Sequence, residues 1–314
     1  DVAPSRGLGD VYKRQIKRYH PHRDLPSHRE EKLYYLLLSI IFSAFVSITM
    51  RLSDKHIRNN MTMFLSNYAV CILLAILFGL RVNTSAFSEG VIFPIGMGLI
   101  SGIMYLVNFI LLQVNINRNG IVLSTTFMKL GVIVPTIMAV VVFHETLTLT
   151  SIAGICLALI SVVIINQNPK EVKNQNVSYQ FSLLLILLAA GGFTDSLANI
   201  YDKCGSASLK DLYLLCTFLF AFLCSLIIKT YKKQRFTFAD LGWGALIGIP
   251  NYFSARFLLL SLSQMPATIV YPVYNIGTIV FVTITGMIFF KERLSLNKWI
   301  AMGIIFLALF LLSI

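Results

Sequence analysis

Charged residues are scarce in this chain, and their scarcity excludes an ordinary soluble protein. They make up 13% of the 314 residues, whereas soluble domains carry roughly 25%. Segments with the alternating pattern of a membrane β-barrel are also missing. Apolar residues, by contrast, reach 56%, with a mean hydropathy of +0.76, and gather in long continuous runs. Since about 20 such residues cross a bilayer as a helix, the composition predicts an all-α membrane protein.

Motifs that would indicate metal, redox or hydrolytic chemistry are missing as well. The cysteines form no C-x-x-C pair and lie in or beside apolar runs: Cys71, Cys156, Cys204, Cys216 and Cys224. Neither H-E-x-x-H nor G-x-S-x-G occurs, so an intramembrane enzyme is the less favoured alternative. Rings of like charge, which would favour a channel, are missing too. We therefore expect no catalytic residue, no metal and no cofactor.

The formal net charge of +12 does not indicate a nucleic-acid partner. The basic residues lie mainly in loops and in the N-terminal tail, and no basic helix is interleaved with aromatic residues. In a membrane protein, basic residues at these places face phospholipid headgroups. The expected surroundings are therefore the lipid bilayer.

The apolar runs predict ten membrane spans in two groups of five, separated by a polar linker at 167–180. The spans are 33–50, 61–80, 91–113, 120–143 and 151–166, then 181–201, 209–228, 240–262, 267–290 and 296–314. Residues 1–32 form a basic polar tail without an apolar core, so they are neither a signal peptide nor a span. Within this tail, the stretch from Gly7 to Gln15 resembles adapter-derived sequence, and we expect residues 1–15 to be non-native.

The two groups of spans, 33–166 and 181–314, resemble each other. At a shift of 147 residues, Phe143-His-Glu-Thr-Leu-Thr-Leu149 falls on Phe290-Lys-Glu-Arg-Leu-Ser-Leu296, which gives F-x-E-x-L-x-L twice. The same shift places Tyr105 on Tyr252. Because each group has an odd number of spans, the second enters the membrane from the opposite side. The prediction is two inverted five-helix repeats, a frequent transporter design.

On this layout and on its repeated motif, the chain resembles the drug/metabolite transporter superfamily, specifically the EamA-type members. The resemblance covers residues 33–314 and includes Phe143-x-Glu145-x-Leu147 and Phe290-x-Glu292-x-Leu294, with His144 where a small or basic residue is more usual. It implies a central cavity lined by spans one, three, four, six, eight and nine. It implies no particular substrate, because members carry amino acids, nucleosides, sugars and drugs.

Three ionisable residues lie inside predicted spans: Lys129, Asp195 and Arg256. A charge at the centre of a span costs roughly 2.5–3.5 kcal/mol on insertion scales, so such residues are functional candidates. Lys129 is a candidate substrate or proton site, and the alternative is a structural ion pair with Asp195. Asp195 is the candidate carrier of a coupling proton. Arg256 is a candidate anchor for an anionic group, and the alternative is a tie to a backbone carbonyl or to Asp195.

Polar and aromatic residues on the same helix faces complete the predicted substrate site. The complete set is Tyr105, Asn108, Lys129, Asp195, Asn251, Arg256, Tyr271, Tyr274 and Asn275. For any single Tyr or Asn, hydrogen bonding between helices is an equally good explanation. Three serines at four-residue spacing, Ser39, Ser43 and Ser47, predict a close-packing face instead. The glutamates of the repeated motif predict helix capping or pairing with basic groups.

These features together predict a secondary active transporter that exports small metabolites such as amino acids by alternating access. The alternatives are drug efflux and a lipid-linked carrier flippase. We expect a multi-pass protein of the bacterial inner membrane, with a small-molecule substrate, protons as the candidate coupling ion, and a monomeric or homodimeric state. The charge distribution does not set the membrane orientation, and the sequence does not identify the substrate.

Overall fold

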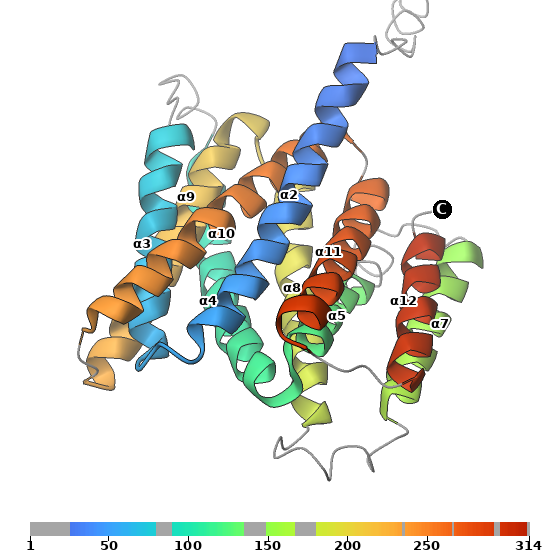
Figure 1. Cartoon of the computed structure of the whole chain (residues 1–314). Coiled ribbons are helices and arrows are strands. Elements are labelled where there is room, and N and C mark those ends of the chain that lie inside the picture. The colour runs from blue at the N-terminus through green and yellow to red at the C-terminus, as the bar shows by residue number, and fades with distance from the viewer. Residues whose placement is uncertain are drawn as a thin grey trace, which may run out of the picture.

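The computed structural model describes residues 26–79, 90–134, 149–166, 180–233, 236–265, 267–291 and 296–312, and all regular structure in these ranges is helical (Figure 1). The α-helices are α2 (Pro26–Ser53), α3 (Asn60–Gly79), α4 (Ile92–Asn119), α5 (Ile121–Leu130), α7 (Leu149–Asn166), α8 (Phe181–Cys204), α9 (Lys210–Tyr231), α10 (Phe238–Gln264), α11 (Ala267–Phe289) and α12 (Leu296–Leu312). A short 3-10 helix, η4 (Ala207–Leu209), precedes α9.

Each predicted span contains one of the described helices, with two differences at the boundaries. Helix α2 begins at Pro26, inside the predicted polar tail, where proline suits the first turn of a helix. Helix α5 ends at Leu130, partway through the predicted span 120–143, of which residues 135–143 lie outside the described ranges. A turn follows at Gly131, whose N–H bonds to the Met128 carbonyl oxygen at 3.2 Å.

The described helices have the length and polarity expected of membrane spans. Six of them contain segments long and apolar enough to cross a bilayer: Leu33–Ser53, Asn60–Gly79, Ile92–Asn119, Phe181–Cys204, Ala207–Tyr231 and Phe238–Gln264. Large apolar side chains face outward, among them Leu77, Ile227 and Ile288, whereas Ser225 and Asn67 are fully buried. This reverses the usual polarity of a water-soluble fold. The chain is therefore a multi-pass membrane protein.

The two halves pack on each other in matching pairs. Helix α3 packs on α10 as α9 packs on α4, and α2 contacts α10 and α11 as α8 contacts α4 and α5. The remaining large contacts join counterparts directly, namely α3 with α9, α5 with α11, and α7 with α12. In Figure 1, α7 and α12 lie together at one end of the bundle, and α2 and α8 run in opposite directions. Exchanging the halves thus reproduces the largest of the helix contacts among the described residues.

Glycines establish how the two halves correspond. A Cβ added at Gly98 would lie 2.5 Å from Cys216 Cβ, and one at Gly102 would lie 2.5 Å from the Thr217 carbonyl oxygen, so α4 meets α9 almost backbone to backbone. Gly244 and Gly248 bring α10 equally close to α3. Pairs of small residues four positions apart allow such an approach between membrane helices.

The equivalent glycines are 146 residues apart, as from Gly102 to Gly248. The shift of 147 that aligns the F-x-E-x-L-x-L motifs is therefore wrong for α4 and α10. One residue turns a helix by about 100°, which is enough to exchange a cavity-facing position for a buried one. The identity of Tyr105 with Tyr252 at that shift is consequently not a structural equivalence, and the counterpart of Tyr105 is Asn251.

Candidate functional site

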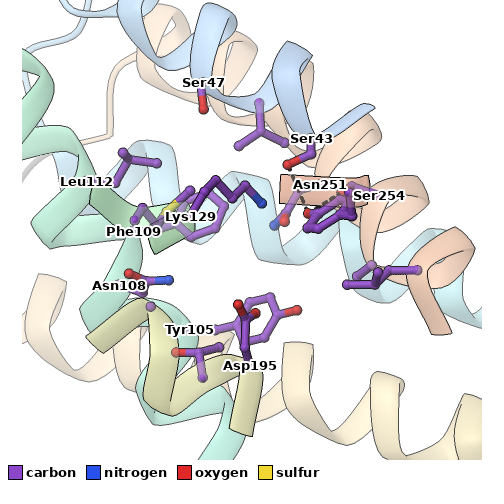
Figure 2. A pocket seen from close by; sticks show the side chains of 17 residues that line it. Ser43, Ser47, Tyr105, Asn108, Phe109, Leu112, Lys129, Asp195, Asn251 and Ser254 are labelled. Atoms are coloured by element: carbon purple, nitrogen blue, oxygen red, sulfur yellow. Dashed lines mark hydrogen bonds between the residues drawn. The ribbon is translucent and has the colours of Figure 1, made fainter. Parts of the chain in front are cut away.

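A cavity of about 100 Å³ lies at the centre of the bundle, between the two halves (Figure 2). Helices α2, α4, α5, α8, α10 and α11 line it, and these are the six spans that the resemblance implies. The lining residues are Ser43, Val46, Ser47, Tyr105, Asn108, Phe109, Leu112, Met128, Lys129, Gly191, Thr194, Asp195, Asn251, Ser254, Ala255, Leu258 and Tyr274.

The lining positions of the two halves are equivalent. On α4 and α10, a shift of 146 residues relates Tyr105 to Asn251, Asn108 to Ser254, Phe109 to Ala255 and Leu112 to Leu258. The same shift relates Met128 of α5 to Tyr274 of α11, and a shift of 148 relates Ser43, Val46 and Ser47 of α2 to Gly191, Thr194 and Asp195 of α8. The cavity is therefore built on two matching sets of backbone positions, whose side chains differ.

Lys129 extends into the cavity from the last turn of α5. Its Nζ lies 3.8 Å from the centroid of the Tyr274 ring, within the range of a cation–π interaction. In Figure 2, its amine end is directed toward Asn251 and Ser254. Gly131, which ends α5, packs against Leu188 and Gly192 of α8, where an added Cβ would lie 2.7 Å from the Leu188 carbonyl oxygen. This close packing fixes the turn from which Lys129 projects.

Asp195 enters the cavity from α8, and its place there follows from glycines one turn earlier. Gly191 and Gly192 let α8 approach α5, because an added Cβ at Gly191 would lie 2.8 Å from the Met128 carbonyl oxygen. Figure 2 places Asp195 and Tyr105 together, on the side of the cavity opposite Ser47.

Lys129 and Asp195 share the cavity without forming an ion pair. Among the described residues, no N···O distance of 4.0 Å or less joins Lys129 to Asp195. The structural ion pair considered from the sequence is therefore absent in this conformation. Each charge faces the same small space from a different half of the protein. An arrangement of this kind can bind the two ends of a ligand that carries both charges.

A hydrogen-bonded group holds the tyrosine beneath Lys129. The Tyr274 hydroxyl donates to Ser43 Oγ at 2.9 Å and lies 3.4 Å from Ser254 Oγ. Ser254 Oγ in turn donates to the carbonyl oxygen of Ser39 at 3.3 Å. Residues of α2, α10 and α11 are thus linked at one wall of the cavity, which keeps the Tyr274 ring in place for Lys129.

A second polar group ties the cavity wall to α3. Asn251 Nδ2 donates to Asn67 Oδ1 at 3.2 Å and lies 3.5 Å from Cys71 Sγ. Cys71 Sγ donates to the carbonyl oxygen of Gly248 at 3.4 Å. These contacts are buried and lie beside the close α3–α10 packing. Asn251 therefore has a structural role in addition to its place in the cavity wall.

Six of the nine predicted substrate-binding residues line the cavity, and three do not. The lining six are Tyr105, Asn108, Lys129, Asp195, Asn251 and Tyr274. Arg256 pairs with Asp211 of α9 at 3.5 Å and donates to the Tyr252 hydroxyl at 2.6 Å, away from the cavity. The Tyr271 hydroxyl donates to the backbone oxygen of Asp195 at 3.4 Å. Asn275 is fully buried beside the lining.

Polar residues on α2, α8 and α10 line the cavity although they were not predicted to do so from the sequence. Ser43 and Ser47 were assigned to a packing face, yet both line the cavity, and Thr194 and Ser254 line it as well. The lining positions relate Ser43 and Ser47 of α2 to Gly191 and Asp195 of α8, a shift of 148 that the gapless alignment at 147 does not show. The motif glutamates, Glu145 and Glu292, lie outside the described residues.

The size of the cavity limits what it holds in this conformation. A volume of about 100 Å³ is well below the roughly 300–1,000 Å³ of typical small-molecule sites. The walls must therefore move apart before a metabolite fits between Lys129 and Asp195. Because the walls belong to different halves, a change in their relative position opens or closes the space.

Comparison with known proteins adds a family and a fold. An uncharacterized protein of Haemophilus influenzae is 31% identical over 201 residues, which are 63% of this chain and 67% of that protein. Residues 210–305, from α9 into α12, match the Small Multidrug Resistance protein family. A protein of known crystal structure aligns with a TM-score of 0.62 at 11% identity, over 88% of this chain and 96% of its own. At that identity, the likeness is one of fold alone.

Proposed function

We propose that this chain, which belongs to the same family as the Haemophilus influenzae protein, is a secondary active transporter of small metabolites. The observation that carries the proposal is the central cavity, with matching lining positions from both halves and two unpaired charges of opposite sign. The match of residues 210–305 to a family of transporter-type membrane proteins supports the same class.

Zwitterionic metabolites such as amino acids best match the two charges of this cavity. Lys129 is placed to receive a carboxylate, and Asp195 is placed to receive an ammonium group from the other side. Lone charges in a membrane span cost roughly 2.5–3.5 kcal/mol on insertion scales, so a ligand that neutralises both recovers part of that cost. The aromatic and amide groups around them, Tyr105, Tyr274 and Asn108, suit a partly apolar substrate.

Alternating access through inverted repeats is the proposed mechanism. It is supported by the exchange symmetry of the helix contacts and by the equivalence of the lining positions. Two similar halves that adopt different conformations can swap them, and the swap moves the opening of the cavity from one side to the other. The EamA-type affiliation, export as the direction and the bacterial inner membrane as the location belong to this proposal. Asp195 is the proposed site of a coupling proton.

Drug efflux is the second candidate, because residues 210–305 match the Small Multidrug Resistance protein family. Asp195 suits a cationic drug, whereas Lys129 opposes one in the same small space. The two candidates therefore make opposite demands on Lys129. Replacing it by methionine should weaken transport of a zwitterion and improve transport of a lipophilic cation.

An untargeted comparison of metabolites tests the proposal. Bacterial cells that express the chain are compared with cells that express Lys129→Met at the same membrane level, in medium and cytoplasm. We expect a small set of zwitterionic metabolites to move across the membrane in the first cells only. Vesicle flux of those compounds, with and without a protonophore, then tests proton coupling. Identical metabolite profiles in the two strains, together with unchanged resistance to cationic drugs, would refute transport through this cavity.

A further inference from the structure

One lining residue of the cavity lacks a lining counterpart. Sixteen of the 17 residues form eight equivalent pairs, and Lys129 remains. At the shift of 146 that relates Met128 to Tyr274, the counterpart of Lys129 is Asn275 on α11. Asn275 has 0% exposure, and neither its amide nitrogen nor its amide oxygen has a hydrogen-bond partner among the described residues.

A buried amide without partners is unusual, because most buried side-chain polar atoms are hydrogen bonded. Thr278 of the next turn, by contrast, is equally buried but bonds to the Tyr274 carbonyl oxygen at 2.7 Å. Asn275 therefore carries polar groups that this conformation does not use. They lie one residue from Tyr274, which does line the cavity.

The helices that carry Lys129 and Asn275 differ in conformation at the same place. After Lys129, backbone N–H groups donate hydrogen bonds to the carbonyl three residues earlier instead of four. These bonds join Gly131 N to Met128 O at 3.2 Å, Val132 N to Lys129 O at 3.4 Å, and Val134 N to Gly131 O at 2.9 Å. Helix α11 continues unbroken from Ala267 to Phe289, through the corresponding turn. The two halves thus share their architecture but hold different states of this helix.

We infer that Asn275 replaces Lys129 in the cavity when the two halves exchange conformations. The inference rests on the proposed function, because such an exchange is the basis of alternating access in inverted repeats. In the exchanged state, α11 adopts the arrangement that α5 has here, and Asn275 enters the cavity. Lys129 then withdraws to the position that Asn275 holds in the present structure.

The exchange changes what the cavity offers to a substrate. In the state described here, a carboxylate meets the ammonium group of Lys129, whereas in the exchanged state it meets the neutral amide of Asn275. A ligand shifts a conformational equilibrium only by its different affinity for the two states. An anionic group therefore favours the present state and is held more weakly in the other, which assists its release on the second side of the membrane.

Cysteine labelling of the full chain tests whether Asn275 enters the cavity. In a background with all five native cysteines replaced, Asn275→Cys is treated with a small water-soluble maleimide in membrane vesicles. Thr278→Cys is the matched control, because Thr278 is equally buried on the same helix and its counterpart Val132 does not line the cavity. Asn108→Cys is the positive control, because both Asn108 and its counterpart Ser254 line the cavity.

We expect Asn275→Cys to react at least about tenfold faster than Thr278→Cys, and more slowly than Asn108→Cys, in line with a minor state populated at about 0.1–10%. Equal labelling after denaturation and a single elution peak establish that each variant is folded and fully reactive. If the folded Asn275→Cys variant reacts as slowly as Thr278→Cys, Asn275 remains buried in every state and the inference is wrong.

A double variant tests the exchange itself. Asn275→Trp places at 275 a side chain too large for the buried position, so the protein is held in the exchanged state before any thiol reagent is added. Lys129→Cys in the same chain should then react at least roughly tenfold more slowly than in the single variant, since minor and major states differ by such factors. If Lys129→Cys reacts equally fast with Asn275 and with Asn275→Trp, the inference is wrong. Absence of substrate flux in the unmodified protein refutes the proposed function instead, and leaves the labelling results unaffected.

Discussion

The first and second halves of this protein agree where helices touch and differ where the cavity is lined. Gly98 and Gly102 on α4 have the same task as Gly244 and Gly248 on α10, and in each case an added Cβ meets the backbone of the facing helix. At the lining positions, Tyr105 of one half corresponds to an amide in the other. Packing against a backbone permits few residue types, whereas a cavity wall permits many. The two halves therefore share their helix packing, whereas the side chains that line the cavity differ between them.

The two charges of the cavity come from different halves. The first half provides the base, Lys129, and the second provides the acid, Asp195, while their counterparts Asn275 and Ser47 are neutral. A ligand that binds both charges therefore joins the two halves across the cavity. This arrangement allows binding to influence how the halves are placed relative to each other.

The largest expected effect concerns the close helix packing at glycines, which both halves share. Gly102→Leu and Gly248→Leu should each destabilise the protein by about 3 kcal/mol or more, because the side chain has no space and the helices must separate. At Gly102 the obstacle is the Thr217 carbonyl oxygen at 2.5 Å, and at Gly248 it is the Asn67 carbonyl oxygen at 2.6 Å. The measurement is the amount of monodisperse protein and its thermal unfolding midpoint in detergent.

Gly96→Leu is the matched control, because an added Cβ at Gly96 meets no atom within 4 Å. It should leave the folded yield close to that of the parent chain. Similar losses for Gly102 and Gly248 support equivalent helix pairs. If one substitution is tolerated and the other is not, the α3–α10 and α4–α9 contacts are not equivalent. The conclusion that the two halves pack alike is then wrong.

The next largest expected effect concerns the charged residues of the cavity, of which each half provides one. Lys129→Met and Asp195→Asn should each reduce substrate flux about tenfold or more, equal to about 1.4 kcal/mol, because each removes one charge that faces the ligand. The double variant should be no better than either single variant, since the two residues form no ion pair in this structure. Flux is measured at matched membrane levels.

Recovery of flux in the double variant would indicate a direct pair between Lys129 and Asp195. If the double variant recovers the flux that each single variant loses, Lys129 and Asp195 compensate each other directly, as a buried pair does. Moving the acid sharpens the test, because Ser47→Asp combined with Asp195→Ser places a carboxylate at the equivalent position of the other half. Recovery of at least part of the flux would indicate that either half can supply the acid.

The sequence was a good guide to the helices and a partial guide to the site, for physical reasons. Long apolar runs identify spans because the hydrocarbon thickness fixes their length. Intramembrane charge identified Lys129 and Asp195 because such charges are costly. The same argument also selected Arg256, which pairs with Asp211 in the first turn of α9, since cost alone does not distinguish a ligand-binding group from a paired one. The register of α4 and α10 depended on glycine packing, which a gapless alignment does not detect.

A smaller effect concerns a feature that only the second half possesses. The Arg256–Asp211 pair corresponds to Ile110 and Met61 in the first half, by the shifts that glycine contacts and lining residues give. Both side chains are partly exposed, at 21% and 46%, so the pair contributes about 1 kcal/mol or less. Arg256→Gln should therefore lower the unfolding midpoint by only about 2–4 °C and leave substrate selectivity unchanged. A changed substrate profile would return Arg256 to the binding site.

The smallest effects concern the ends of α2 and α8. Asp54 and Asp202 occupy equivalent positions, 148 residues apart like Ser47 and Asp195. Asp54 accepts from Gln113 Nε2 at 3.4 Å, whereas Asp202 accepts from Lys210, which also donates to Ser263 Oγ at 2.9 Å. Each carboxylate thus links the end of its helix to neighbouring segments. If the halves are inverted, the two links lie on opposite sides of the membrane, and each must loosen for its own side to open.

Asp54→Asn and Asp202→Asn should therefore favour opening on opposite sides. Hydrogen bonds of this kind contribute about 0.5–1.5 kcal/mol, so each change should raise the accessibility of its own side roughly two- to tenfold. The effect of Asp202→Asn should be the larger one, because its link to α9 is a direct bond from the charged Lys210, whereas the link of Asp54 to α4 is a bond from a neutral amide and its ion pair with Arg51 lies within the same helix end at 4.0 Å. The measurement is labelling of Asn108→Cys by an impermeant maleimide in sealed vesicles of known orientation. Increased labelling from the same side in both variants would contradict the inverted relation of the halves, because equivalent residues would then control one entrance instead of two.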